Sequence, residues 1–507
     1  MQTMKRPFML IGGGILFASF LLPIVGGLVA AGILIGTAIL AFCLYPKDKR
    51  LSPRSSLTAV ILLLAAIRFL TLDLYISHKT ARLAEYDAEI EAVVYDIEAQ
   101  KNTSRFYLDI ISSTAEEAEG MSAVGYMFEA VTFSSGDRIR AEVTFKENDD
   151  RYKYSDFDSG RYISAKVKNY VVTERAASLI HSFADKTRRG ILSAANSLGA
   201  DDKAKLLGGV LIGNKRSITV DISDDVRATG TSHMLVVSGL HLGILCGLVM
   251  RLLKTRTDRR LTVLIMTLFV IFIAVICLFH ISILRAGLTY IIMLTGMLIF
   301  RDSDSVNSLG FATTVLAFLF PYLFYNVAFM LSAAATFAVI GPAGSILETF
   351  RFGFKSSSLF LRAVRYIFEV FTVAVCALVL TLPITVYYFG STALIAPLSN
   401  LLLSFSVTGM LAAGMLGALI WFIPAVGKIV SIPFIFVAKL FAGYFLFTVK
   451  VIAESGIGFM DIFPDNSVYC GIFALIFILT VHFICKKVNS KKEIKPRAYR
   501  KDPESLD

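Results

Sequence analysis

Long apolar runs recur along this chain and dominate its pattern of hydrophobic and polar positions. Each run is close to twenty residues, which as a helix is long enough to cross a bilayer core of roughly 30 Å. About twelve such segments are present, at residues 8–25, 28–45, 57–76, 233–250, 261–280, 284–300, 306–325, 327–346, 366–389, 395–420, 429–449 and 469–485. The pattern predicts a polytopic α-helical membrane protein in which some of the twelve segments are re-entrant or tilted.

A long polar stretch interrupts the apolar runs between residues 77 and 232. From Asp87 to Val172 apolar and polar positions alternate, which is typical of strands. The five predicted strands are EIEAVVYDI, SRFYLDII, GYMFEAVTF, DRIRAEVTF and YISAKVKNYVV, with a turn at Ser135-Gly136-Asp137 before the fourth. Five short strands in about 85 residues are typical of a small Greek-key barrel such as an OB-fold.

Two helices are predicted after the strands. Thr173 to Asn196 has the pattern of an amphipathic helix that begins near a threonine cap, and Asp201-Asp202 caps a second helix that ends by Gly213. The predicted domains are therefore three N-terminal transmembrane helices (1–76), an extracytoplasmic OB-like β-barrel (77–172), an extracytoplasmic helical connector (173–232), a second transmembrane domain (233–487) and a basic tail (488–507).

Composition and charge agree with a membrane protein. At 55% hydrophobic residues over 507 positions, the chain is not an ordinary soluble protein. The net charge is +11, yet residues 77 to 232 hold about 21 basic and 25 acidic side chains, so the basic excess lies elsewhere. It lies in five clusters, Lys5-Arg6, Lys47 to Arg54, Arg251 to Arg260, Arg351 to Arg365 and Lys486 to Lys501.

Basic loops stay on the cytoplasmic side of a membrane. With twelve crossings, all five clusters are cytoplasmic. The prediction is a multi-pass protein of the cytoplasmic membrane with both termini in the cytoplasm and residues 77–232 outside. The basic charge thus indicates topology and is not evidence for a ligand.

The most unusual polar residues lie in the apolar segment TGTSHMLVVSGLHLGILCGLVM, from Thr229 to Met250. On one continuous helix, His233, Ser238 and His241 fall within an arc of roughly 140°. Because imidazole and hydroxyl groups are costly in hydrocarbon, this arc is predicted to line a protein or water surface. In the alternative interpretation, backbone carbonyls bind both histidines, which have no further role.

Three glycines lie on the opposite side of the same predicted helix. Gly239, Gly243 and Gly247 are spaced four residues apart and form a small-xxx-small stripe. Such a stripe lets a neighbouring helix approach closely, so we expect it to serve helix packing.

Arg285 is the candidate cation of the membrane domain. The apolar stretch from Leu261 to Phe300 is about forty residues, enough for two spans, so its turn is predicted near His280 to Ile283. Arg285 then lies at the outer end of a span, against the positive-inside bias. Its guanidinium fork suits a phosphate better than an ammonium does. The alternative is an arginine that snorkels to the interface or pairs with a carboxylate.

Two further positions are candidates for a pore lining. Pro383 in LTLPITV and Asn400, which follows Pro397, lie where a helix break would offer unpaired backbone to a pore. An ordinary proline kink and an interhelical amide bond explain the same residues equally well.

Aromatic and basic side chains interleave in the predicted barrel. Such a composition suits single-stranded nucleic acid, because rings stack on bases and cations meet phosphates. Strands are also rich in aromatic residues for reasons of packing, so both interpretations stay open. The candidate DNA contacts are Phe106, Arg138, Arg140, Lys153, Tyr154 and Arg161.

Metal, cofactor and motor sites have no support in the sequence. The six histidines are scattered with no HxHxDH cluster, and the six cysteines lie in or beside apolar segments without a CxxC pair. GVLIGNKRS resembles a phosphate-binding P-loop, but Asn214 occupies the position of the required lysine. We therefore predict no metal, no cofactor and no nucleotide-driven motor.

Several motifs together resemble the ComEC family of bacterial competence proteins, the inner-membrane channels for incoming DNA. The resemblance is broad around GVLIGNKRSITVDISDDVRATGTSHMLVVSGLHLGIL, and the SGLH block is specific. Further similar blocks are SDFDSGRY, ILRAGLTY, FPYLFYNVAFMLSAAA, LTLPITVYYFG and SNLLLSF. The resemblance implies that residues 233–487 form a competence-type channel domain.

The chain departs from the family pattern in one respect. Many members continue into a metallo-β-lactamase-type nuclease domain, whereas this sequence stops about twenty residues after its last apolar segment. We therefore expect a non-enzymatic protein whose nuclease is a separate polypeptide.

The resemblance implies a channel that moves single-stranded DNA into the cytoplasm during natural transformation. The partners it implies are single-stranded DNA, membrane lipid, an external DNA receptor, a separate nuclease and a cytoplasmic ATPase, with a homodimer left open. Two alternatives remain. One is a permease for a small or lipid-like solute with an external binding domain, and the other is an intramembrane hydrolase with Ser238 as nucleophile and a histidine as base.

Overall fold

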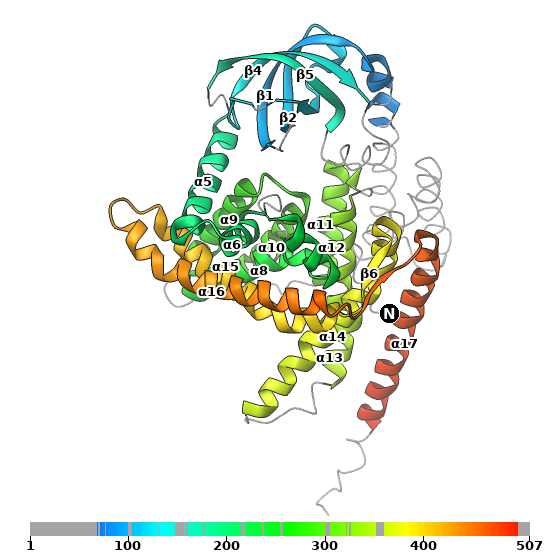
Figure 1. The fold of residues 1–507 in the computed structure, drawn as a ribbon. Helices are drawn as coiled ribbons and strands as arrows, with labels where there is room; N and C mark the ends of the chain where they lie inside the picture. The colour runs from blue at the N-terminus through cyan, green and yellow to red at the C-terminus, as the bar shows by residue number, and fades with distance from the viewer. Residues whose placement is uncertain are drawn as a thin grey trace, which may run out of the picture. The chain divides into compact units, whose positions relative to one another are not determined.

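The computed structural model forms two compact units. Figure 1 labels its helices and strands. It describes residues 68 to 494, apart from positions 69–70, 73, 77, 100–103, 130, 148–156, 158–160, 176–177, 214–217, 236–237, 254–256, 300–304, 321, 324–325 and 351–358. The first unit comprises the described residues of Met1–Thr219, His233–Met330 and Val407–Gly443, and the second those of Val220–Ser232, Leu331–Ser406 and Tyr444–Asp507. The first two predicted spans, most of the third and the end of the basic tail lie outside the described residues.

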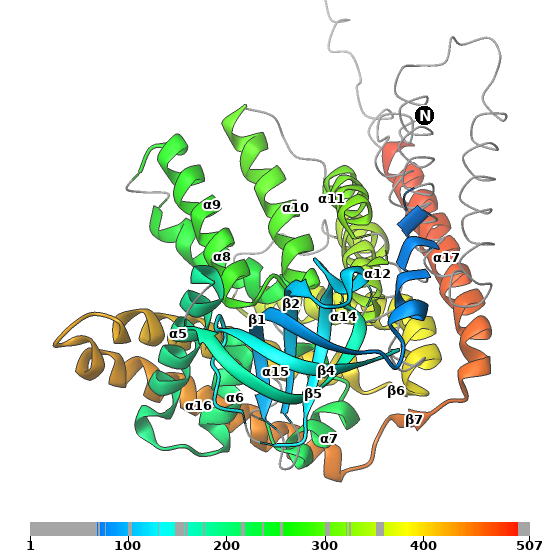
Figure 2. The ribbon, with the colours of Figure 1, turned by 90° about the horizontal axis from the view of Figure 1, so that it is seen from above.

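A closed five-stranded barrel belongs to the first unit (Figure 2). Its strands follow the order β1-β2-β3-β5-β4, and β4 pairs with β1 to close the sheet. β3 and β5 are parallel, whereas the other neighbours are antiparallel. The strands are β1 (Asp87–Ala99), β2 (Ser104–Ser113), β3 (Ser122–Met127), β4 (Arg138–Lys146) and β5 (Arg161–Glu174), with the short helix η2 (Glu116–Ala118) between β2 and β3.

All five strands overlap the predicted runs, and the largest difference in their ends is in the third strand. The third strand ends at Met127 and does not continue to Phe133. Phe128 leaves the barrel with 65% of its surface exposed. Phe133 instead turns inward and packs edge-on against Phe106 in the barrel core, with ring centroids 4.9 Å apart.

The connector consists of short helices. Helix α5 (Leu179–Ala195) begins after Ser178 and not near Thr173, because β5 continues to Glu174. After the single turn η3 (Asn196–Leu198), helix α6 (Asp202–Ile212) is capped by Asp201, whose carboxylate accepts the N–H of Ala204. Gly213 ends α6 in the left-handed region, at φ 75°, which confirms both predicted ends. Helix α7 (Val220–Ala228) belongs to the second unit.

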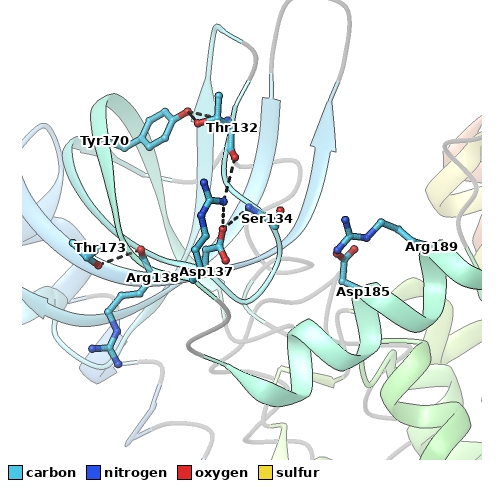
Figure 3. Close-up of polar contacts among 9 residues, drawn as sticks. Thr132, Ser134, Asp137, Arg138, Tyr170, Thr173, Asp185 and Arg189 are labelled. Atoms are coloured by element: carbon cyan, nitrogen blue, oxygen red, sulfur yellow. Dashed lines mark hydrogen bonds and ion pairs between the residues drawn. The ribbon is translucent and has the colours of Figure 1, made fainter.

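A buried carboxylate fastens the end of β5 to the turn before β4 (Figure 3). Asp137 accepts the N–H of Ser134 at 2.8 Å and pairs with Arg175 at 2.7 Å. The neighbouring turn residue Gly136, at φ 96°, accepts the N–H of Ser178, the residue that precedes α5. The first turn of α5 is therefore fixed to the barrel by backbone and side-chain bonds.

The membrane part of the first unit begins with a short helix. The turn η5 (Ser232–Met234) precedes α8 (Gly239–Leu253), which has 15 residues and is shorter than the predicted span 233–250. It packs with α9 (Arg259–Ile276) and α10 (Ile281–Leu298), and α10 packs with α11 (Ser305–Leu319). The predicted turn near His280 is confirmed, because His280 is the N-cap of α10.

The second unit contains long helices joined by a small sheet. Two three-residue strands, β6 (Ser391–Ala393) and β7 (Phe459–Asp461), pair antiparallel. Helices α15 and α16 each extend from one unit into the other. The elements are α12 (Val327–Ala338), the π-helical segment η7 (Val339–Ala343), α13 (Gly344–Phe350), α14 (Leu359–Phe389), α15 (Ala396–Trp421), α16 (Gly427–Glu454), η9 (Pro464–Asn466) and α17 (Ser467–Ile494).

Seven helices in the described part of the chain are long and apolar enough to cross a membrane. The protein is accordingly a polytopic helical membrane protein with an N-terminal β domain. The predicted number of twelve is not reached among the described residues, because α8 and Ser308–Leu319 fall short of a full span and the first three segments lie largely outside them.

His181 makes barrel stability sensitive to acid. Its ring stacks on Tyr95, with centroids 4.8 Å apart, and its Nδ1 lies 2.8 Å from Ser178 Oγ. Burial lowers the pKa of His181 below 6.5, against the opposing charge of Asp109. The unfolded chain therefore binds the proton at a higher pH than the folded chain. The contribution of His181 to stability is complete above about pH 6.5 and is lost as the pH falls below it.

We expect His181→Phe, which keeps an aromatic ring against Tyr95, to flatten the fall in melting temperature between about pH 7.5 and 5. Thermal unfolding of the detergent-purified protein measures the slope. The exposed His78 offers the matched control, and His78→Phe should keep the wild-type slope. A slope in His181→Phe equal to that of the wild type would show that this histidine is not responsible.

Candidate functional site

A serine and a histidine cap the start of α8. The carbonyl of Ser238 accepts the N–H of Leu242 at 3.1 Å, as an N-cap residue does. The N–H of Ser238 donates to Nδ1 of His241 at 3.3 Å, and the hydroxyl lies 2.9 Å from the same nitrogen. Because Nδ1 accepts the N–H, the hydroxyl is also a donor to it. The imidazole of His241 thus accepts the N-cap N–H, as the carboxylate of a capping box does.

This cap keeps His241 neutral, with its proton on Nε2. The side chain is fully buried. Nε2 has no hydrogen bond of ordinary geometry among the described residues, although the backbone carbonyl of Met234 is within its reach. A buried imidazole N–H therefore remains on the side of the ring that faces away from Ser238.

The predicted polar arc on one helix is wrong. His233 is exposed and lies in η5, Ser238 precedes α8, and His241 is in its first turn. The chain is not helical at Ser238, whose backbone N–H donates to the ring of His241.

Arg285 lies at the same end of α8. Its side chain is in the first turns of α10 and is 4% exposed. A Cβ placed on Gly239 would lie 3.4 Å from Nη2 of Arg285 and 3.3 Å from Cβ of Ala286. Gly239 thus lets α10 approach the first N–H groups of α8. A guanidinium beside a helix N-terminus forms a cluster of hydrogen-bond donors suited to an anion.

The other glycines of the predicted stripe do not pack closely. Gly243 and Gly247 are exposed, and a Cβ on either would meet no described atom within 4 Å. Among the described residues the close-packing role therefore falls to Gly239.

Pro383 and Asn400 do not break their helices. α14 continues through the buried Pro383, and α15 continues through Asn400, whose Oδ1 has no hydrogen-bond partner among the described residues. Both belong to the second unit, whereas Ser238, His241 and Arg285 belong to the first. The predicted helix breaks are absent from residues 359–389 and 396–421.

The predicted contacts of the barrel differ in their surroundings. Phe106 is fully buried in the core and is excluded as a contact residue. Arg138 points away from Asp137 (Figure 3) and lies 3.8 Å from Glu91 and 3.6 Å from Glu174. Arg140 is exposed on β4. Lys153 and Tyr154 lie outside the described residues.

Arg161 belongs to a different face, formed by β2, β3 and β5. Its guanidinium carbon lies 3.3 Å from the centre of the Tyr107 ring. On the same face, Arg105, Tyr126 and Lys166 are paired across the three strands in one row. Lys166 also lies 5.2 Å from the ring of the exposed Phe128. We name Arg105, Tyr126, Phe128, Arg161 and Lys166 the cationic-aromatic face.

Most of this face was not predicted from the sequence. The alternation of inward and outward side chains along a strand could have identified it. In SRFYLDII, Phe106 alternates with Arg105 and Tyr107, so the phenylalanine must face the core when the other two face outward. No group of histidine, cysteine and carboxylate side chains that could hold a metal occurs among the described residues.

Comparisons with known proteins place the α8 site in a family region. The family model described as Competence protein matches residues 210–484, which include Ser238, His241 and Arg285. ComE operon protein 3 of Bacillus subtilis (strain 168) is 26% identical over 235 residues, which cover 46% of this chain and 28% of that protein. The chain therefore matches less than a third of that relative's length. No solved structure matches the chain.

Replacement of Ser238 tests the cap of α8. Ser238→Ala removes the hydroxyl donor to His241, and we expect it to lower the free energy of unfolding by about 1 kcal/mol. Ser238→Thr keeps a hydroxyl and should retain most of that stability. Unfolding of the purified protein in detergent measures both variants, and equal stability of Ser238→Ala and wild type would contradict the capping role.

Proposed function

The chain belongs to the Competence protein family, and from this premise we propose that it is a channel that carries single-stranded DNA across the cytoplasmic membrane during natural transformation. Family membership supports a role in DNA uptake. The movement of a single strand into the cytoplasm is what the resemblance to the ComEC family implies, and the chemistry of the α8 site supports it.

A single strand has one negative charge per nucleotide, so its path through hydrocarbon must contain water or compensating groups. The observation that supports this path is the buried guanidinium of Arg285 beside Gly239 at the N-terminus of α8. Arg285 and the first N–H groups of α8 can together receive a phosphate. We place Ser238 and His241 beside this contact as positioning residues, because their mutual bonds define where α8 begins.

We propose that the barrel guides DNA toward the membrane. The strand order 1-2-3-5-4, closed between β1 and β4, supports an OB-like barrel. OB-folds bind oligonucleotides on the face of strands 2 and 3, which here bears Arg105, Tyr126 and Phe128. Alternating rings and cations on that face can stack on bases and meet phosphates.

The orientation and the partners are also proposals. The basic loops support cytoplasmic termini and an external position for residues 77–232. We propose that the protein is not itself an enzyme, and that an external DNA receptor, a separate nuclease and a cytoplasmic ATPase act with it. The pore lies within one chain or between two chains of a homodimer.

Replacement of Arg285 tests the path. We expect Arg285→Ala to lower the transformation frequency about ten- to a hundred-fold, because a charge-assisted contact contributes roughly 1.5–3 kcal/mol. Arg285→Lys keeps the positive charge but loses the two-pronged guanidinium, so its transformation frequency should lie between those of the wild type and Arg285→Ala. The measurement is the yield of transformants in a competent host that has this protein as its channel, with immunoblots of the membrane fraction to compare protein levels.

Arg365 provides the control for that experiment. Its guanidinium pairs with Glu369 one turn along α14, at 2.7 Å and outside the proposed path. Arg365→Ala should therefore transform normally. A normal yield from Arg285→Ala at an equal protein level would count against Arg285 as a phosphate contact.

The barrel has its own test. We expect Phe128→Ala and Lys166→Glu to weaken binding of a labelled single-stranded oligonucleotide to the purified protein, since each stacked base contributes about 1–3 kcal/mol. Fluorescence anisotropy measures the affinity. Lys168→Glu makes the same charge change two residues along β5, where the lysine pairs with Asp87 at 2.9 Å, and it should have a smaller effect. Equal losses from Lys166→Glu and Lys168→Glu would indicate general charge attraction and contradict a specific face.

A further inference from the structure

Helices α15 and α16 form a hairpin whose contacts disagree with an upright position in the membrane. They have 26 and 28 residues, and each is apolar enough to be a candidate span. At 1.5 Å per residue each is about 40 Å long. If α15 stood upright, its two ends would lie on opposite sides of a hydrocarbon core of roughly 30 Å.

Both ends of α15 contact the connector. In the second unit, a Cβ placed on Gly230 would lie 2.7 Å from Cβ of Ala396, the first residue of α15. In the first unit, a Cβ placed on Gly190 of α5 would overlap the ring of Phe422, the residue after α15 ends. An upright α15 would therefore require the connector to reach both sides of the membrane.

Among its described residues, the connector has no segment long and apolar enough to cross the membrane. Between Gly190 and Gly230 its apolar helix is α6, with 11 residues and a length of about 16 Å, half of what a crossing needs. The helices on either side of α6 are charged. α5 contains Asp185, Lys186, Arg188 and Arg189, and α7 contains Asp221, Asp224, Asp225 and Arg227.

A charged contact at the middle of α16 also argues against an upright position in the membrane. The ammonium of Lys439 lies 2.7 Å from Asp201 and donates to the carbonyls of Leu198 and Gly199 at 3.2 and 3.0 Å. One turn further along, Gly443 lies against the side chain of Lys203. In an upright α16 these charges would be near the centre of the bilayer, where they are most costly. In a flat α16 they lie at the interface.

The face of α16 opposite its buried residues Ile435, Ala438 and Ala442 is apolar and exposed. Ile429, Phe436, Leu440 and Phe447 repeat at helical spacing with exposed fractions of 70%, 55%, 58% and 70%. No charged residue interrupts this row, so acyl chains are the partner that fits it.

We propose that the α15–α16 hairpin lies along the membrane surface, in the leaflet on the connector's side, and does not span the bilayer. The connector contacts one face of the hairpin, and acyl chains contact the row of Ile429, Phe436, Leu440 and Phe447. The proposal concerns membrane placement and does not depend on DNA transport.

The depth of spin labels along α16 tests this placement. The labels are attached to single cysteines at Ile429, Phe436, Leu440 and Phe447, in a protein without its native cysteines, reconstituted in lipid vesicles. We expect similar depths at all four positions. An upright α16 would rise about 27 Å from Ile429 to Phe447, and depths that increase to a maximum at the middle positions would overturn the proposal. The exposed positions Ile472, Leu479 and Phe483 of α17, a candidate span, are the matched control.

A second measurement needs no change in the apolar row. Lys428 lies at the start of α16 and is exposed, and the proposal places it on the same side of the membrane as the barrel. A membrane-impermeant maleimide should label Lys428→Cys and the barrel variant Lys168→Cys from the same side of intact cells or spheroplasts. Labelling of Lys428→Cys only after permeabilisation, with Lys168→Cys labelled before it, would overturn the proposal. Neither experiment uses DNA, so its result is separate from the test of the channel.

Discussion

Hydrocarbon cannot solvate charged groups or unpaired backbone, and this constraint governs where the polar residues of the protein lie. Arg285 lies against the first N–H groups of α8, and Lys439 meets a carboxylate and two carbonyls. His241 is neutral because Ser238 occupies its Nδ1. Each buried ionisable group thus marks a place where the helix meets protein or water and not lipid.

The connector links these polar sites to the barrel. Ser178 bonds to the barrel turn at Gly136, Asp201 caps α6 and pairs with Lys439, and the leucines of α6 pack against Gly414 of α15. In a protein that passes a charged polymer, such fixed attachment would hold the proposed binding face of the barrel in a defined position relative to the helices of the first unit. The connector is therefore a structural part of the proposed pathway and more than a linker.

The α8 site illustrates how one set of contacts supports different functions. The short distance between Ser238 and His241 is what an intramembrane hydrolase would need, but both donors of Ser238 are used to start a helix. A helix N-terminus next to a guanidinium is suited to an anion whatever the molecule that carries it. Family membership favours a nucleic acid phosphate over the headgroup of a permease substrate, and it does so for residues 210–484, which contain this site.

The sequence by itself determined the membrane class, the polar insert, the number of its strands, and the ends of α6. These features depend on local patterns: apolar length, the period of two along a strand, and an aspartate and a glycine at the two ends of a helix. The same period of two also predicts which side chains of β2 face inward. Applied to Phe106 and Arg105, it places the phenylalanine in the core and the arginine outside.

Tertiary structure decided where α8 begins and which residues distant in sequence contact one another, because local patterns do not encode such contacts. An apolar segment that includes His233 has the length of a span, but the bonds between Ser238 and His241 start the helix at Gly239 and leave it too short. Arg285 was a candidate from its position, yet its partner at Gly239 is 46 positions away along the chain. The contacts of α15 and α16 with the connector are equally distant in sequence. Apolar length predicts that a helix prefers lipid, but the contacts at its ends decide its direction in the membrane.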